Sequence, residues 1–155
     1  MTSAIAVFLR VYDHSPAAGD DGTRLKWQNF FVEKAIDGFL FEPFDVSDIT
    51  INRTADEGGL TMQMPALALH LDFFLNSIEA DRLAEVWIYE MDVATSMPTD
   101  ISGAVLVARF VGEIISLSTD LTEIQLELGA SIDAVSGEIP GRRVTTSVVG
   151  RLPTL

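Results

Sequence analysis

Apolar residues recur at every second position in several segments of this chain, and this alternation is the feature that most constrains its fold. Successive side chains of a β-strand point to opposite faces, so a period of two indicates strands. In residues 122–128, Ile124, Leu126 and Leu128 alternate with acidic and amide side chains, which predicts one core face and one wet acidic face. Residues 5–12 are largely apolar on both faces, which predicts a strand covered on each side.

Turn-forming residues separate the further strand candidates. Proline, glycine and paired aspartates predict a loop over residues 14–23, and Asp37-Gly38 indicates a tight turn. Pro43 predicts an interruption, because proline cannot donate to a strand ladder, and residues 60–64 alternate like the second strand of a hairpin. The further strands are predicted over residues 25–32, 39–53, 60–64, 86–91, 104–112 and 113–118, with a last short strand or extended arm over 144–149.

One segment has the period of a helix instead. Its apolar residues lie three and four positions apart, which predicts an amphipathic helix over residues 66–78, followed by a second short helical turn over 79–84. Many strands and a single inserted helix favour a mainly β (α+β) domain, a small antiparallel β-barrel or sandwich, because a parallel sheet would need more helices. The apolar stripe of the helix consists of Leu67, Leu71, Phe74, Leu75 and Ile78.

Charge is distributed unevenly along the chain. Its 155 residues carry 23 acidic and 10 basic side chains, for a net charge of −13, but residues 141–155 contain no acid. Because the Pro140-Gly141 pair breaks regular structure, we expect a β-barrel or sandwich body over 1–140 and an extended C-terminal arm over 141–155. Charge alone does not assign the arm a partner, since a solvated chain end has the same composition. The arginines of the arm are Arg142, Arg143 and Arg151.

Composition excludes several classes of function. The chain has no cysteine, which rules out disulfides, thiolate zinc sites, iron–sulfur clusters and cysteine nucleophiles. Its negative charge repels phosphates and anionic lipids, so nucleic acid is not an expected partner. Charged residues interrupt every apolar stretch before the roughly 20 residues needed to cross a bilayer, so no membrane insertion is expected. The length suits one domain with its own core.

No pattern of residues indicates catalysis. The two histidines lack the spacing of a metal site or a base–nucleophile pair, so both are expected to be ordinary structural or surface residues. The acidic pairs lack the order of a calcium loop and the glycines form no phosphate loop, so no metal, cofactor or catalytic residue is predicted, and the chain is not expected to be an enzyme. The histidines are His14 and His70, and the acidic pairs are Asp20 with Asp21, Asp56 with Glu57, and Glu123 with Glu127.

Three stretches and the C-terminal segment carry a resemblance. They are residues 48–66 (DITINRTADEGGLTMQMPA), 77–92 (SIEADRLAEVWIYEMD), 106–131 (LVARFVGEIISLSTDLTEIQLELGAS) and 141–153 (GRRVTTSVVGRLP). In pattern and order the chain resembles the hub-domain proteins of tailed-phage tail tips and baseplates, a group that includes minor tail protein L and gene-transfer-agent hub proteins. Some members carry a cysteine cluster for iron–sulfur binding, and this chain departs from them because it has no cysteine.

The resemblance implies a structural virion component, an adaptor between the distal tail tube and the hub. Its partners would be other tail or baseplate proteins and copies of itself, and it would reside in the phage tail after assembly in the host cytoplasm. A terminus that bears arginines tends to reach a neighbouring subunit in that family, which is the role implied for Arg142, Arg143 and Arg151.

Two other functions stay open from the residues alone. Apolar content and paired aromatic residues also suit a small-molecule or lipid-binding β-barrel, which would be a monomer with a filled cavity. A carboxylate-based hydrolase would instead depend on residues such as Asp20, Asp21, Asp56 or Glu57.

Overall fold

In the residues that it describes, the computed structural model of the chain is mainly β with one helix, which confirms the predicted fold class. It describes residues 3–30, 34–50, 59–92 and 100–130. In these ranges the elements are β1 (Ser3–Tyr12), β2 (Thr23–Gln28), β3 (Leu40–Phe41), β4 (Asp45–Thr50), β5 (Gly59–Pro65), α1 (Ala68–Glu79), β6 (Leu83–Asp92), β7 (Val105–Thr119) and β8 (Glu123–Ala130).

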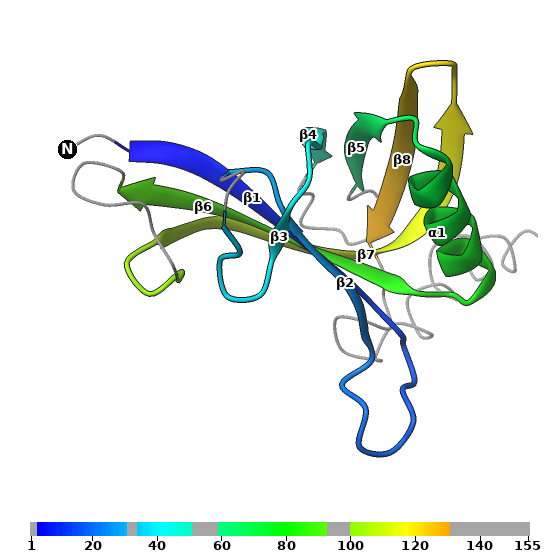
Figure 1. Cartoon of the computed structure of the whole chain (residues 1–155), viewed down its shortest axis with the longest axis horizontal. Helices are drawn as coiled ribbons and strands as arrows, with labels where there is room; N and C mark the ends of the chain where they lie inside the picture. The colour runs from blue at the N-terminus through cyan, green and yellow to red at the C-terminus, as the bar shows by residue number, and fades with distance from the viewer. Residues whose placement is uncertain (1–2, 31–33, 51–58, 93–99, 131–155) are drawn as a thin grey trace, which may run out of the picture.

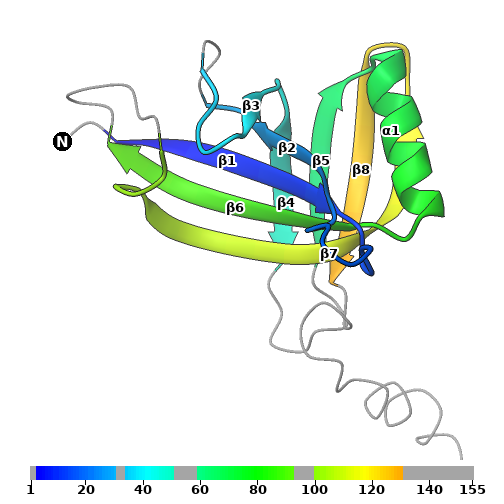
Figure 2. The same cartoon turned by 60° about the horizontal axis from the view of Figure 1, so that its bottom comes forward.

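The eight strands of the described residues form one sheet in the order β3-β2-β1-β6-β7-β8-β5-β4. Neighbouring strands are antiparallel except β2 and β3, which pair in parallel. The sheet is not closed on itself, and β3 and β4 are its outermost strands. Figures 1 and 2 show β1, β6 and the first half of β7 as a long curved ribbon, while β5, β8 and the end of β7 stand beside α1.

β7 is one continuous strand of 15 residues, whereas the sequence predicted two strands that meet at Gly112 and Glu113. The prediction was wrong because Gly112 does not turn the chain. It pairs with Ala84 of β6 on one side and with Ala130 of β8 on the other. Glycine inside a strand often marks a close approach of another backbone, and a Cβ at Gly112 would collide with the carbonyl oxygen of Gly129.

The main core lies between α1 and one face of the sheet. Phe74 of α1 is fully buried there, against the alternating side chains of β8 that the sequence assigned to a core face. Full burial of a large apolar side chain stabilises a fold by about 1.5–3 kcal/mol relative to exposure. The sheet residues buried in this core are Val7, Leu9, Val11, Leu60, Met62, Met64, Ala84, Val86, Ile114, Ile124, Leu126 and Leu128, and Phe44 joins them from the segment before β4.

The middle of β1, residues 6–9, is covered on both faces, as the sequence predicts for this strand. Val7 and Leu9 point into the main core, whereas Ala6 and Phe8 point into a second cluster on the opposite face. Phe30, Ile36 and Phe39 supply part of the cover of that second face. The remaining buried members of this second cluster are Ile36, Phe39 and Met91.

The predicted helix is confirmed as α1, but its apolar stripe is only partly buried. Leu71 and Ile78 pack against the core together with Phe74, whereas Leu67 and Leu75 are 52% and 45% exposed. Polar residues take part of the buried face instead. The polar residues that α1 buries are His70 and Ser77.

The second helical turn predicted over residues 79–84 is absent from the structure. The chain turns at Ala80 and Asp81, where Asp81 has a φ of 50°, and β6 begins at Leu83. This left-handed residue ends the helix, since continuation would require a negative φ. Leu83 is buried, in agreement with its predicted inward orientation.

The predicted turns and hairpin are confirmed. Asp37 and Gly38 have φ values of 49° and 79°, and Ile36 and Phe39 pair across the turn. Pro43 lies between β3 and β4, where the sequence predicted an interruption. β4 and β5 pair in antiparallel fashion as the predicted hairpin. The C-terminal arm and the strand predicted over 144–149 lie outside the described residues.

Candidate interaction surface

The first half of β7 has one edge that no strand covers in the described part of the chain. β6 pairs with β7 from Val105 onward, but β8 pairs with β7 only from Gly112 onward. We call residues 105–111 of β7 the ribbon edge. Because no described strand pairs with the backbone groups on that side of the ribbon edge, they can accept a further strand.

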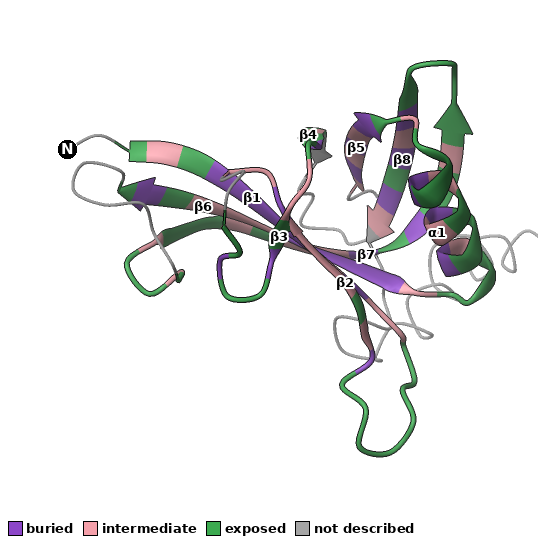
Figure 3. Ribbon diagram, viewed as in Figure 1, coloured by how far each residue is buried: buried purple, intermediate pink, exposed green. Residues whose placement is uncertain are grey.

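The first three side chains of the ribbon edge are apolar and exposed. Val105, Leu106 and Val107 are 63%, 49% and 57% exposed, and Figure 3 shows the exposed colour at the start of β7. Ile5, near the start of β1 in the same ribbon, is 59% exposed. Several large apolar side chains gathered at one end of an acidic protein are typical of an interaction surface.

A β-bulge shapes the ribbon edge. The register of β6 and β7 shifts between Ile88 and Tyr89, which leaves Val107 without an opposing residue on β6. A second irregularity leaves Ile115 without an opposing residue on β8, and Ile115 is 63% exposed. Bulges re-aim side chains and are frequent at functional edges. Both bulges of β7 thus present an apolar side chain to solvent.

Aromatic residues pack the second face of the ribbon. Phe8 contacts the rings of Phe39 and Tyr89 edge to face, with centroids 5.1 and 5.5 Å away. Phe39 in turn contacts Trp87 at 5.9 Å in the same geometry. Such pairs contribute about 0.5–1.5 kcal/mol each beyond burial. The ribbon is therefore a packed unit that holds its edge in place.

The single charge of the ribbon edge is paired. Arg109 donates from Nε to Glu85 Oε1 at 2.5 Å, and Arg10 Nη1 lies 3.8 Å from Glu85 Oε2. Glu85 is only 4% exposed, and a buried carboxylate requires such cations. Burial, and next the charge of Glu85, raise the pKa of Tyr12. Arg109 thus shares the single carboxylate of Glu85 with Arg10, so the ribbon edge carries one paired cation beside its apolar side chains.

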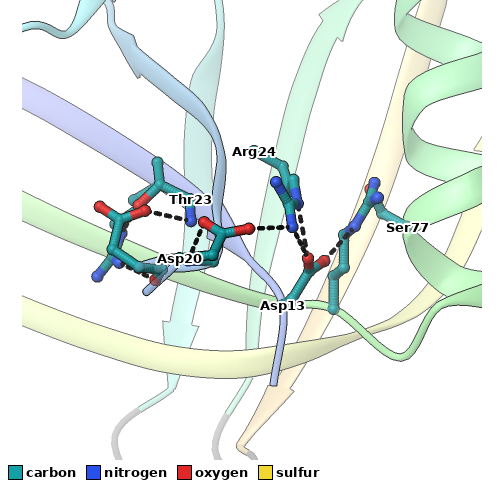
Figure 4. Close-up of polar contacts among 9 residues, drawn as sticks. Asp13, Asp20, Thr23, Arg24 and Ser77 are labelled. Carbon is teal, nitrogen blue, oxygen red and sulfur yellow. Dashed lines mark hydrogen bonds and ion pairs between the residues drawn. The ribbon is translucent and has the colours of Figure 1, made fainter. Parts of the chain in front are cut away.

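A polar cluster ties the β1–β2 loop to the end of α1 (Figure 4). Asp13 accepts hydrogen bonds from Arg24 Nε at 2.6 Å and from Arg82 Nε at 2.8 Å. Arg24 also donates to Asp20, and Arg82 donates to Ser77 Oγ at 3.2 Å. The hydrogen bonds from Arg24 and from Arg82 lower the pKa of Asp13.

We expect Asp13→Asn to reduce the dependence of the free energy of unfolding on pH in the acid range. A carboxyl whose folded pKa is lowered stabilises the fold above its unfolded pKa, about 3.9, and this stabilisation is lost as the pH falls through the folded value. At about pH 6 the free energy of unfolding in urea should therefore be lower for the variant than for the unchanged protein. This difference should become smaller below about pH 4.

The matched control for Asp13 is Asp72→Asn, which makes the same change at an exposed position of α1. Its pH profile should follow that of the unchanged protein. A difference between Asp13→Asn and the unchanged protein that stays constant with pH would contradict this role of Asp13.

The acidic pair of the β1–β2 loop stabilises that loop. Asp20 Oδ1 accepts from the N–H of Gly22 and Asp21 Oδ1 from the N–H of Thr23, each at 2.9 Å. The hydrogen bond from the N–H of Thr23 lowers the pKa of Asp21. These carboxylates satisfy backbone groups of their own loop.

The other acidic pairs are not brought together with that loop. Glu123 and Glu127 lie on β8, opposite Pro65 and Thr61 of β5, and both are exposed. Glu127 accepts a hydrogen bond from the hydroxyl of Ser116. Within the described ranges, no group of three or more metal-binding side chains is close enough to hold an ion. The remaining pair, Asp56 with Glu57, lies outside the described residues.

The two histidines occupy different places. His14 is exposed in the β1–β2 loop, as expected for a surface residue. His70 is 4% exposed and lies between Trp27, whose ring centroid is 4.8 Å away, and Glu42, whose Oε2 is 3.6 Å from Nε2. His70 is therefore a packed residue of the interface between α1 and the sheet.

The sequence interpretation missed the ribbon edge. The partner residues that the sequence suggested lie outside the described residues; they are Arg142, Arg143 and Arg151. The ribbon edge, in contrast, is described and is mainly apolar. A signal was present, because the strand predicted over 104–112 is apolar at consecutive positions and thus on both faces. Only strand pairing shows which of those positions the fold leaves uncovered.

No helix in the described part of the chain has the length and apolar character needed to cross a bilayer. Comparison of the sequence with protein-family models and with curated proteins finds no match.

Proposed function

We propose that this chain is a structural subunit of a phage tail tip or baseplate, an adaptor that joins the distal tail tube to the hub through protein–protein contacts. The ribbon edge is the observation that supports an assembly role. It combines backbone groups that no strand of the described residues covers with exposed Val105, Leu106 and Val107 on a packed support. The resemblance of the sequence to tail-tip hub proteins is the reason for proposing the phage tail as the particular assembly.

Strand addition is the contact that this surface favours. A partner strand would satisfy the backbone groups of residues 105–111 and cover their apolar side chains in one step. Proteins that keep such an edge in solution usually protect it with charged or proline residues. Here Arg109 is the sole charged residue of the edge, and it pairs with Glu85, a carboxylate that it shares with Arg10.

We expect Val107→Lys to weaken assembly, because a charge on the bulge must be desolvated when a partner strand binds. The matched control is Leu121→Lys, which places the same charge on a fully exposed leucine just beyond the opposite end of β7. Native mass spectrometry and sedimentation would give the proportion of oligomer for each variant. Equal assembly by both variants would remove the ribbon edge from the proposal.

A second experiment addresses the arm. Truncation after residue 140 should reduce co-assembly with other tail or baseplate proteins if Arg142, Arg143 and Arg151 bind a neighbouring subunit. Unchanged co-assembly of a folded truncated protein would refute that role. A purified monomer that carries a bound lipid would count against the assembly function as a whole.

The virion role has a separate test. Antibodies or peptide mass spectrometry should detect the chain in purified phage particles. Its gene should lie among tail genes, between those for a tape-measure protein and a tail fibre. A position in a metabolic operon would overturn the virion role and leave assembly through the ribbon edge as a property of another complex.

A further inference from the structure

The last described residue of β8 lies at the inner end of the ribbon edge. Ala130 pairs with Gly112 of β7, and the residue before it, Gly129, pairs with Glu113. Because the two strands are antiparallel, each step forward along β8 is a step backward along β7. The chain continues after Ala130 as residues 131–155. This continuation therefore starts at the point where the ribbon edge starts.

The alternation that defines β8 persists in the sequence beyond its last described residue. The buried side chains of β8 occupy the even-numbered positions from 124 to 128. Ala130 and Ile132 continue this apolar series, whereas Ser131 and Asp133 continue the polar one. A period of two predicts a strand with one core face, and it ends at Ser136-Gly137, a pair typical of turns.

The register of β7 and β8 gives the core face of this continuation a partner. Continued from the pair of Ala130 with Gly112, the register places Ile132 opposite Phe110. Phe110 packs against the main core and is only half-buried by the described residues. Side chains that lie directly opposite each other share a face and touch. Ile132 at this position would therefore extend the core of β8 over Phe110.

The same register places opposite charges on facing positions. Asp133 falls opposite Arg109, the sole charged residue of the ribbon edge. Arg109 pairs with Glu85 of β6, shares that carboxylate with Arg10, and has a side chain that is 57% exposed. One carboxylate thus serves two arginines. A second carboxylate on the other side of Arg109 is favourable, because facing strand residues of opposite charge attract each other.

We propose that residues 131–135 of this chain cover the ribbon edge in the free subunit as a continuation of β8, and that a partner strand replaces them during assembly. The segment offers what the edge requires, namely backbone groups for pairing, an apolar side chain for Phe110 and a carboxylate for Arg109. Covering an edge prevents unspecific association through it. The replacement step rests on the proposed function, whereas the pairing within the chain does not.

Engineered disulfides test the pairing, because the chain has no cysteine of its own. The register places Ala134 opposite Ala108, at a Cα separation of about 4.5–5.5 Å, which a disulfide can bridge. Under mild oxidation, Ala108→Cys with Ala134→Cys should form at least about fivefold more disulfide within one chain than Ala108→Cys with Val135→Cys, whose side chain would point to the other face. Intact mass and non-reducing electrophoresis measure this. Equal yields, or disulfides only between two chains, would overturn the covering within the chain.

Hydrogen exchange tests the covering without cysteines. In the unchanged protein, those amides of residues 105–111 that do not face β6 should exchange at least about tenfold more slowly than in Ile132→Asp, which places a charge against Phe110. The matched control is Ile139→Asp, the same change beyond the segment, which should leave the exchange as in the unchanged protein. Equal exchange of these amides in all three proteins would overturn the inference.

Sedimentation separates this inference from the proposed function. Ile132→Asp should raise the proportion of assembled protein relative to Ile139→Asp, because it uncovers the edge. If no pairing is detected and Val107→Lys still weakens assembly, the self-covering fails and the assembly function stands. If pairing is detected but Val107→Lys and Leu121→Lys assemble equally, residues 131–135 are a permanent part of β8. The covering then stands, and the replacement step falls together with the role of the ribbon edge in assembly.

Discussion

Replacing Gly112 by alanine is expected to destabilise the fold by about 3 kcal/mol or more, with loss of pairing between β7 and β8. A Cβ at this position would collide with the carbonyl oxygen of Gly129, and it would lie 2.9 Å from the carbonyl carbon and 2.7 Å from the ring of Phe110. Backbone atoms cannot rotate away from such a contact. Because β7 carries the ribbon into the other half of the sheet at Gly112, relief requires the two halves to separate.

The same substitution at Gly129 is the matched control. There a Cβ would meet the end of the Ile115 side chain, which is 63% exposed and can change rotamer. Gly129→Ala should therefore lie within about 1 kcal/mol of the unchanged protein, helped by the lower entropy of alanine in the unfolded chain. Urea unfolding would measure both variants. Similar stabilities for Gly112→Ala and Gly129→Ala would show that β7 does not pair with β8 at Gly112 as described.

Truncation of Phe74 is expected to have the second large effect. Its ring is fully buried between α1 and the sheet and contacts Trp27 and Phe73 with centroids 5.8 and 5.2 Å away. Phe74→Ala removes these contacts and leaves a cavity, which typically costs about 3–5 kcal/mol in the free energy of unfolding. The two-state unfolding midpoint in urea should fall accordingly.

The adjacent residue supplies the control for Phe74. Leu75 is 45% exposed on the outer side of α1, so Leu75→Ala should change the free energy of unfolding by less than about 1 kcal/mol. Phe74→Leu should lose less stability than Phe74→Ala because it retains much of the buried volume. Equal effects at positions 74 and 75 would contradict the orientation of α1.

Local patterns predicted most of the individual elements. Strict alternation in β5 and β8 identified their buried faces, because a strand with one wet face must place apolar residues at every second position. The turn at Asp37-Gly38 was predictable for a similar reason, since glycine accepts a positive φ at little cost.

Where prediction failed, tertiary contacts decided. Gly112 suggested a break, but its small size serves a close approach of β7 to Gly129, a residue that is distant in sequence. Leu75 belonged to the apolar stripe, yet the packing of α1 on the sheet buries His70 and Ser77 and leaves Leu75 exposed. The hydrophobic period gives the face of a helix only approximately, and the opposing surface selects which residues are covered.

The candidate surface could not be predicted from the sequence. An apolar run at the start of β7 indicates a strand covered on both faces, as for β1, and the middle of β1 is covered. The difference arises because, among the described residues, β8 pairs with β7 only from Gly112 onward, which leaves residues 105–111 at an edge.

By itself, then, the sequence determined the fold class, the alternation of buried and exposed strand positions, the single helix and several of the turns. These depend on interactions between residues close together in the chain. Tertiary structure decided that the sheet stays open, that β7 runs unbroken through Gly112, and that its first half is exposed. The physical reason is that strand order and edge exposure depend on pairing between distant segments, whose free energies no local pattern records.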